Sequence, residues 1–248
     1  MLTVAFLHQD VTAQPGIRLP VPVFMQEMMD AKGQAPKMTR MENFLDFAAI
    51  SENLQLQPVF YPWRRAISKA ANGEGLIFGM ARNKQNEKNF HFSLPVHSRY
   101  FFLVTRADAQ FPFHDWNDLK GKSVGVPRGA QFNEAFEAHQ DKLFRLEQDS
   151  PEPLSRIYKL LFKRMDAAVF ASPVKNPKML ENRLQTLREE HKGGLPQIDD
   201  VELAVLPNPL MTENLHFAIR SDKDDGVIGQ LNDAILRARK AGILEDIR

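Results

Sequence analysis

Apolar strand-like runs alternate with amphipathic helical segments along this chain, and that order limits the fold more than any other feature of the sequence. Residues 2–7 and 76–80 are apolar runs with the length of buried strands, and residues 54–61 alternate apolar with polar side chains. Residues 38–53 carry apolar side chains at helical spacing, and a second helix is expected from Pro62 to about Ala71. The resulting strand-helix-strand-helix-strand order predicts a parallel sheet covered by helices.

The second part of the chain follows the same order. Strands are predicted at residues 100–105, 123–126, 167–170, 201–206 and 217–219, and helices at residues 132–139, 153–163, 177–191 and 227–241. Residues 9–37 contain enough proline and glycine to break a long element, which leaves room for one short helix at residues 24–29. The chain is therefore expected to form two α/β units of ~100 residues each.

The composition excludes several classes of function. A net charge of +1 gives no overall field that would attract nucleic acid or an anionic membrane. The 248 residues include no cysteine, which excludes disulfides, thiolate metal sites and cysteine nucleophiles. The seven histidines show no zinc-ligand spacing, and no nucleophile elbow, Walker A motif or dinucleotide fingerprint is present. We therefore predict no catalytic residue, no metal site and no cofactor.

Six short segments, each weak alone, stand in a distinctive order. They are Pro62-Trp63-Arg64-Arg65-Ala66, Asn72-Gly73-Glu74-Gly75, Phe92-Ser93-Leu94-Pro95, Asp118-Leu119-Lys120-Gly121-Lys122 continuing to Gly129, Arg164-Met165-Asp166-Ala167, and Leu231-Asn232-Asp233-Ala234-Ile235 followed by Gly242. In this order the chain resembles the extracellular solute-binding proteins of family 3, the periplasmic receptors of ABC importers. The resemblance covers nearly the whole chain and is weakest at residues 10–37 and 172–196.

The resemblance implies an α/β fold of two Rossmann-like lobes joined by two hinge crossings, with a ligand cleft between them, which is the periplasmic-binding-protein-like II arrangement. Lobe I would comprise residues 1–96 plus 215–248, and lobe II residues 97–214. The crossings are expected near residues 94–99 and 212–215. Open α/β sheets bind ligands beyond the carboxyl ends of their strands, and hinge closure would then exclude water from the ligand.

The resemblance also points to ligand-binding residues in the first lobe. Asp10 would follow the first strand, although a loop carboxylate that stabilises a turn is an equal alternative. Trp63 could form an apolar wall of the cleft or belong to the core. Arg82 would follow the strand at residues 76–80 and suits bidentate recognition of a carboxylate, the alternative being a surface ion pair with Glu74 or Glu87.

In the second lobe the candidates are Arg128, Gly129, Gln131 and Ser172. The segment Gly129-Ala130-Gln131 is expected to open a helix, where backbone N–H groups would bind an anion. The alternatives are an ordinary strand-to-helix turn and, for Arg128, a side chain that points into solvent. Ser172 would follow the strand at residues 167–170.

Two departures from the family pattern concern the ligand. Amino-acid receptors of this family place an Arg shortly before the Phe-Ser segment and often an Asp at the end of the second-lobe strand, and the matching residues here are Asn86 and Ala171. Each charge-assisted hydrogen bond is worth ~1.5–3 kcal/mol. We therefore predict that the preferred ligand is not a standard α-amino acid.

The function implied by the resemblance is that of a periplasmic solute-binding protein that delivers a small polar or anionic solute to an ABC permease. We expect a monomer and, because no signal peptide is visible, a mature chain from which the signal has been removed. Two alternatives share the fold. One is an enzyme similar to cyclohexadienyl dehydratases, with Glu74 or Glu87 as a buried acid or base, and the other is the sensor domain of a membrane receptor.

Overall fold

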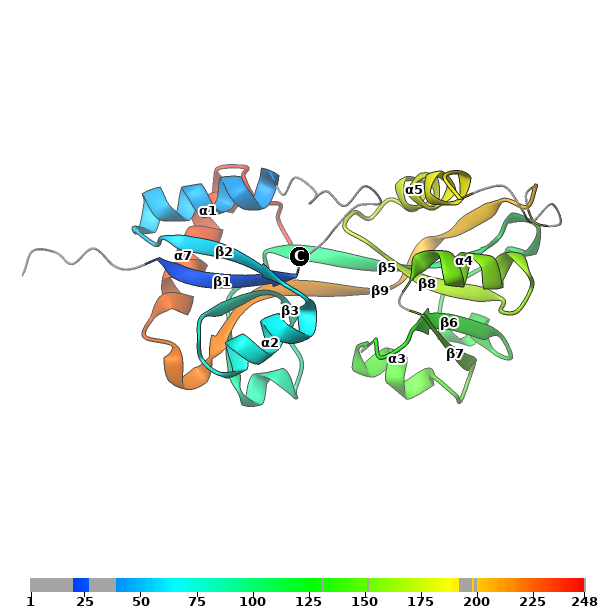
Figure 1. Ribbon diagram of the computed structural model, residues 1–248, viewed down its shortest axis with the longest axis horizontal. Helices are drawn as coiled ribbons and strands as arrows, with labels where there is room; N and C mark the ends of the chain where they lie inside the picture. The colour runs from blue at the N-terminus through cyan, green and yellow to red at the C-terminus, as the bar shows by residue number, and fades with distance from the viewer. Residues whose placement is uncertain are drawn as a thin grey trace, which may run out of the picture.

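The computed structural model describes residues 20–26, 39–130, 132–150, 152–191, 198 and 200–247 (Figure 1). Its first elements are β1 (Val21–Gln26), α1 (Thr39–Glu52), β2 (Leu56–Tyr61), α2 (Trp63–Ala71), β3 (Leu76–Ala81) and β4 (Phe90–Phe92). The remaining elements are β5 (His97–Arg106), β6 (Ser123–Pro127), α3 (Glu134–His139), β7 (Arg145–Asp149), α4 (Pro153–Leu161), β8 (Ala167–Ser172), α5 (Pro177–Glu189), β9 (Leu203–Arg220) and α7 (Val227–Lys240). Strands and helices alternate from β1 to β3 and again from β6 to α7, whereas β4 and β5 follow β3 without an intervening α-helix.

The helix predicted at residues 24–29 is wrong over its first three positions, because they form the end of β1. β1 lies between β2 and β3 in the sheet, and the strand predicted at residues 2–7 lies outside the described residues. Pro22 fits into this central strand because it pairs only with β2, and β3 joins one residue later at Val23. A proline near a strand's start removes no hydrogen bond on the side that is not yet paired.

Two further strand predictions need correction. β7 was not predicted, because Arg145, Glu147 and Gln148 give it the polar composition of a loop, and its position at the edge of the sheet tolerates that composition. The strands predicted at residues 201–206 and 217–219 are one 18-residue strand, β9. Pro207 and Pro209 read as strand breakers, but the strand passes through them with register shifts against β5.

All the strands of the described residues belong to one nine-stranded sheet with the order β2-β1-β3-β9-β5-β8-β6-β7, and β4 pairs with β9. On one side β1 runs parallel to β2 and β3, and on the other β6 runs parallel to β7 and β8. The two long strands between these groups, β5 and β9, are antiparallel to each other. Figure 1 shows them extending through the middle of an elongated molecule.

The buried side chains form separate cores at the two ends of the sheet. At one end, α1 and α7 cover one face of β1, β3 and β9, and α2 covers the other face. At the other end, the faces of β5, β6 and β8 are covered by α3 on one side and by α4 and α5 on the other. The buried residues of the two clusters under α1, α7 and α2 all come from 23–96 and 217–244. Those of the two clusters under α3, α4 and α5 all come from 101–211.

The segments predicted as crossings are hydrogen-bonded to each other. His97 to Tyr100 of β5 pair with Leu215 to Thr212 of β9, so that the connection between the two cores is a two-stranded antiparallel ribbon. Ser98 Oγ donates a hydrogen bond of 2.9 Å to Asn214 Oδ1 across this ribbon. Among the described residues, no helix is long and apolar enough to cross a bilayer.

Candidate functional site

A bulge in β3 decides which side chains lie at its carboxyl end. Gly79 has a φ of +95°, and the pairing of β3 with β9 shifts by one residue between Phe78 and Met80. Phe78 packs in the core under α1 and α7, whereas Met80 belongs to the core under α2. The bulge therefore interrupts the alternation of the strand and directs Met80, and with it Arg82 two residues later, to the α2 face.

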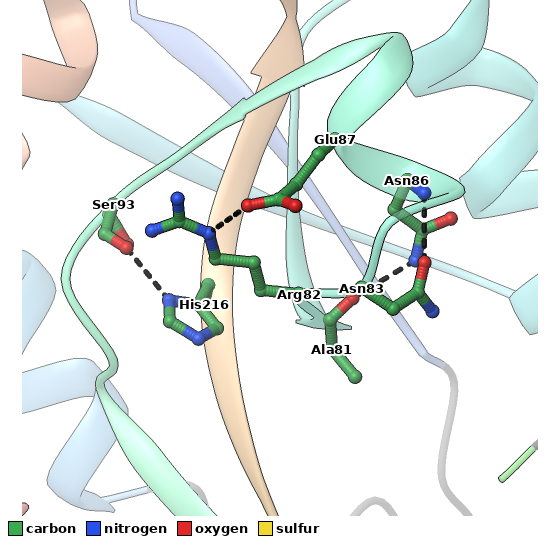
Figure 2. A network of polar contacts seen from close by, with 7 residues as sticks. All are labelled: Ala81, Arg82, Asn83, Asn86, Glu87, Ser93 and His216. Atoms are coloured by element: carbon green, nitrogen blue, oxygen red, sulfur yellow. Dashed lines mark hydrogen bonds and ion pairs between the residues drawn. The ribbon is translucent and has the colours of Figure 1, made fainter. Parts of the chain in front are cut away.

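On the same face, Ser93 anchors the chain as it leaves β4 (Figure 2). Its N–H donates to the carbonyl of Phe217 at 2.9 Å, and its Oγ accepts from the N–H of Phe217 at 3.0 Å and donates to the carbonyl of Leu94 at 2.7 Å. The Ser93 carbonyl oxygen accepts a 2.7 Å hydrogen bond from Nδ1 of His216. Hydrogen bonds to β9 thus hold the Phe-Ser segment in place where the chain passes from β4 to the ribbon.

His216 is a buried histidine that lies opposite Met80 in the strand pairing. The ring of Phe92 packs edge-on against it, with centroids 5.8 Å apart. Burial lowers the pKa of His216 below its ordinary value of 6.5, and the nearby positive charge of Arg82 lowers it further, although the hydrogen bond to Ser93 opposes both effects. The imidazole is therefore neutral at pH 7. The sequence analysis did not select His216, because a single histidine within a strand carries no motif.

Arg82 lies directly after β3 and has a largely exposed side chain (Figure 2). Its Nε donates to Oε1 of Glu87 at 2.5 Å. Of the two surface ion pairs named as alternatives for Arg82, the one with Glu87 therefore forms, whereas Glu74 pairs with Lys69. No other hydrogen bond of the guanidinium is formed within the described part of the chain, so both terminal nitrogens remain able to donate. A guanidinium held by one edge retains the geometry needed to bind a carboxylate.

Asn86, which the predicted resemblance matches to an arginine of amino-acid receptors, is held within its own loop. Its Nδ2 donates a 3.0 Å hydrogen bond to the carbonyl of Ala81, and its backbone N–H donates to Oδ1 of Asn83 at 2.8 Å (Figure 2). The side chain therefore closes the loop after β3. That loop holds the backbone from which Arg82 extends.

The loop after β6 differs from the prediction. Gly129 and Ala130 do not open a helix, because α3 begins at Glu134 and its N-cap is Asn133, whose side chain accepts from the N–H of Phe136. Arg128 and Gly129 are exposed in the intervening loop, and the Arg128 N–H donates to the carbonyl of Asp149. Gln131 lies outside the described residues. The short loop thus takes the place of the expected helix N-terminus.

The other candidates have local roles. Ser172 is buried at the end of β8, and its hydroxyl donates to the carbonyl of Val174 at 2.8 Å. Ala171, which the resemblance matches to an Asp of many amino-acid receptors, pairs with Phe101 of β5. Trp63 begins α2 and packs half-buried against the core under that helix. Asp10 lies outside the described residues.

One ion pair joins the loops at the two ends of the sheet. Nζ of Lys84, which follows β3, lies 3.1 Å from Oε2 of Glu134, the first residue of α3, and both side chains are largely exposed.

A cavity of about 190 Å³ lies next to α3. Its lining residues, among them Phe132, Glu137 and Gln148, all belong to the end of the sheet that contains α3. Among the residues that the structure describes, no group of three or more His, Cys, Asp or Glu side chains is arranged to hold a metal ion.

No family model matches the chain, and no curated protein sequence matches it. Several solved structures do. The arginine-bound substrate-binding protein AbpA of an amino acid ABC transporter from Streptococcus pneumoniae is 17% identical, with a TM-score of 0.61 and 90% of both chains covered. The glutamate-bound GluR0 ligand-binding core from Nostoc punctiforme is 18% identical, with a TM-score of 0.59, and 90% of this chain and 95% of that chain are covered.

A histidine kinase sensor domain with similarity to periplasmic binding proteins is also similar in structure. It is 17% identical and has a TM-score of 0.62, with 90% of this chain and 91% of that chain covered. These likenesses confirm the predicted fold, which is the type II fold of periplasmic binding proteins.

Proposed function

From the type II periplasmic-binding-protein fold of this chain, we propose that the protein binds a small polar or anionic solute between two lobes and delivers it to the permease subunits of an ABC importer. The observation that carries the proposal is the β5–β9 ribbon between two separately packed cores, with Arg82 at the carboxyl end of β3 beside it. Ligand sites of α/β sheets lie at such strand ends. On this proposal the protein is periplasmic and monomeric.

The lobes are proposed to comprise residues 1–96 plus 215–248 and residues 97–214. The membership of the hydrophobic clusters supports this division, since no cluster includes described residues from both sets. The ribbon between them is suited to act as a hinge, because within the described residues only two strands connect the cores.

The proposed solute is polar or anionic and is not a standard α-amino acid. Arg82 supports the anionic part, since its terminal nitrogens are free to donate within the described part of the chain. Asn86 bonds to its own loop, and Ala171 has no charge, so neither provides the partner that a zwitterion would need.

A role as the sensor domain of a receptor is the second candidate, and it is supported by the likeness to the GluR0 core and to the kinase sensor domain. An enzyme similar to a dehydratase finds less support. Glu74 and Glu87 are about 40% exposed, and each is paired with a cation. The hydrogen bond from Lys69 is the main cause that lowers the pKa of Glu74, whereas a general acid needs a raised pKa.

A thermal-shift screen over carboxylates, amino acids, opines, polyamines and sugars tests the proposal. A ligand present at ~100 times its Kd stabilises the folded state by ~2.7 kcal/mol, which raises the Tm of a chain of this size by roughly 5–10 °C. A screen in which no compound raises the Tm would remove the proposed function.

A further inference from the structure

His216 has one ring nitrogen whose role is fixed and one that is unused. Nδ1 lies 2.7 Å from the carbonyl oxygen of Ser93, so it must carry the proton of the neutral ring. Nε2 is then a hydrogen-bond acceptor with a free lone pair. It forms no hydrogen bond within the described chain, and it is not among the fully enclosed polar atoms that lack a partner. This nitrogen is therefore not fully enclosed by the described residues.

The surroundings of His216 favour a specific contact. Only 6% of the surface of His216 is exposed. An acceptor in such a place gains little from water, so a donor brought by a ligand forms a hydrogen bond with little competition. The Ser93 contact, the Phe92 ring and the strand pairing with Met80 fix the ring, which lowers the entropy lost on binding.

Arg82 is the charged group that faces this histidine. The two residues lie on the same face of the sheet, near the end of β3 and on the adjacent part of β9, and the charge of Arg82 acts on the His216 ring (Figure 2). Glu87 is the carboxylate that pairs with Arg82 there. The site thus combines a cation with free donors and a neutral acceptor. The cation disfavours an ammonium group beside it, because like charges repel.

We propose that His216 is a ligand-binding residue and that, with Arg82, it selects a carboxylate that bears a hydroxyl group on a neighbouring carbon. The carboxylate receives hydrogen bonds from the terminal nitrogens of Arg82, and the hydroxyl donates to Nε2 of His216. This inference rests on the proposed function and defines its ligand class as the hydroxycarboxylic acids.

The test compares hydroxy acids with their deoxy analogues on the full chain. Lactate, malate, gluconate and quinate are titrated by calorimetry beside propionate, succinate, hexanoate and cyclohexanecarboxylate. At least one hydroxy acid is expected to bind roughly tenfold more tightly than its analogue, as one hydrogen bond of this kind provides. Equal affinity within every pair overturns the inference.

The variant His216→Asn isolates the acceptor. The Asn amide can still donate to the Ser93 carbonyl in place of Nδ1, but it has no atom at the position of Nε2. The roughly tenfold preference for the hydroxyl group is expected to vanish, while binding of the deoxy analogue changes little. His97→Gln is the matched control, because His97 pairs with Leu215 and therefore lies on the opposite face of the sheet from His216. A preference that survives in His216→Asn overturns the assignment of His216.

Nitrogen-15 NMR of histidine-labelled protein gives a readout that a structural role would not change. The free protein is expected to show the tautomer with the proton on Nδ1, and the Nε2 resonance of His216 is expected to move when the preferred hydroxy acid is added. An Nε2 resonance unchanged at saturation overturns the inference. If another compound of the thermal-shift screen binds and no hydroxy acid does, the inference is wrong while the proposed function stands, and if none binds, both are wrong.

Discussion

Arg99 of β5 and Glu213 of β9 face each other directly across the ribbon that connects the two cores, with Nη2 2.7 Å from Oε2. The Glu213 side chain is only 9% exposed, and the guanidinium of Arg99 also lies over the Phe101 ring at 5.1 Å. A carboxylate in so enclosed a position depends on its partner, because water cannot replace the lost hydrogen bond.

Replacing Glu213 with Gln should therefore lower the free energy of unfolding by about 1–3 kcal/mol. Urea titration of the variant measures the change. The ion pair between Arg40 and Glu245 is the matched control, since both side chains are more than half exposed. Glu245→Gln should cost less than ~1 kcal/mol. Equal effects of the two substitutions would contradict the idea that the ribbon pair contributes through its burial.

Gly79 is the position where the backbone of β3 most restricts the side chain. A residue with a Cβ is strained at a φ of +95°, although no atom would contact the added Cβ. Gly79→Ala should destabilise the protein by about 1–3 kcal/mol and weaken anion binding, because the bulge directs Arg82. Gly229, an exposed position in α7, gives the opposite expectation: Gly229→Ala should stabilise by about 0.5–1 kcal/mol. A Gly79→Ala variant with unchanged stability and affinity would show that the bulge is dispensable.

His97 and His216 should make stability depend on pH above the range where carboxylates titrate. Burial is the main cause that lowers the pKa of both below 6.5. Near His97, Arg40 and Arg99 lower it further and Glu245 opposes them. In the unfolded chain these histidines bind protons at about pH 6.5, whereas in the folded protein they do so only at lower pH.

Because the unfolded chain binds these protons more readily than the folded protein, lowering the pH lowers the free energy of unfolding. The contribution of both histidines is complete above pH 6.5 and is lost as the pH falls from 6.5 through their lowered folded values. The Tm should thus decrease between pH 7 and pH 5, and the double variant His97→Gln/His216→Asn should flatten that part of the curve.

Below the ordinary aspartate pKa of 3.8, a second loss of stability is expected from Asp224. Burial raises the pKa of Asp224, but its bonds with His91 and with two backbone N–H groups outweigh that effect and lower it. A double variant with the native slope would refute the assignment of the upper transition.

The contrast between β7 and the other strands shows what the sequence predicts well. Buried strands such as β6 and β8 are continuous apolar runs, so their positions and the repeated strand-helix order could be predicted locally. β7 contains Arg145 and Glu147 at an edge, and β1 begins beside Pro22, so both resemble loops until their neighbours are known. Local propensity is weak evidence where the tertiary position decides.

The candidate site divides in the same way. Arg82 could be selected because it follows an apolar run, but its direction depends on a bulge that no motif marks. His216 and Ser93 are 123 residues apart, and their contact exists only because β9 returns to pair with β4. The helix expected at residues 132–139 forms as α3, but it begins only at Glu134 because Asn133 caps it, so Gly129 lies in the loop before it.

Lys84 and Glu134 allow a direct test of lobe closure. Their ion pair joins the loop after β3 to the start of α3, and the chain has no cysteine. The double variant Lys84→Cys/Glu134→Cys can therefore be linked by a short bifunctional maleimide at a single place. If the lobes move about the ribbon, the link should slow both binding and release of ligand by at least ~10-fold. Stopped-flow fluorescence with linked and unlinked protein measures the rates, and identical rates would argue against hinge motion.

Arg82 and Glu87 separate a binding role from a structural one. Both side chains are about half exposed, so their ion pair should contribute less than ~1 kcal/mol to stability. If Arg82 binds the carboxylate of the ligand, Arg82→Gln should weaken affinity roughly 10- to 150-fold, the equivalent of ~1.5–3 kcal/mol for a charge-assisted hydrogen bond. Glu87→Gln should leave affinity unchanged or raise it, because a competing carboxylate is removed. A structural pair predicts the reverse pattern, with equal stability losses in both variants and no change in affinity in either, and calorimetry together with urea titration distinguishes the two.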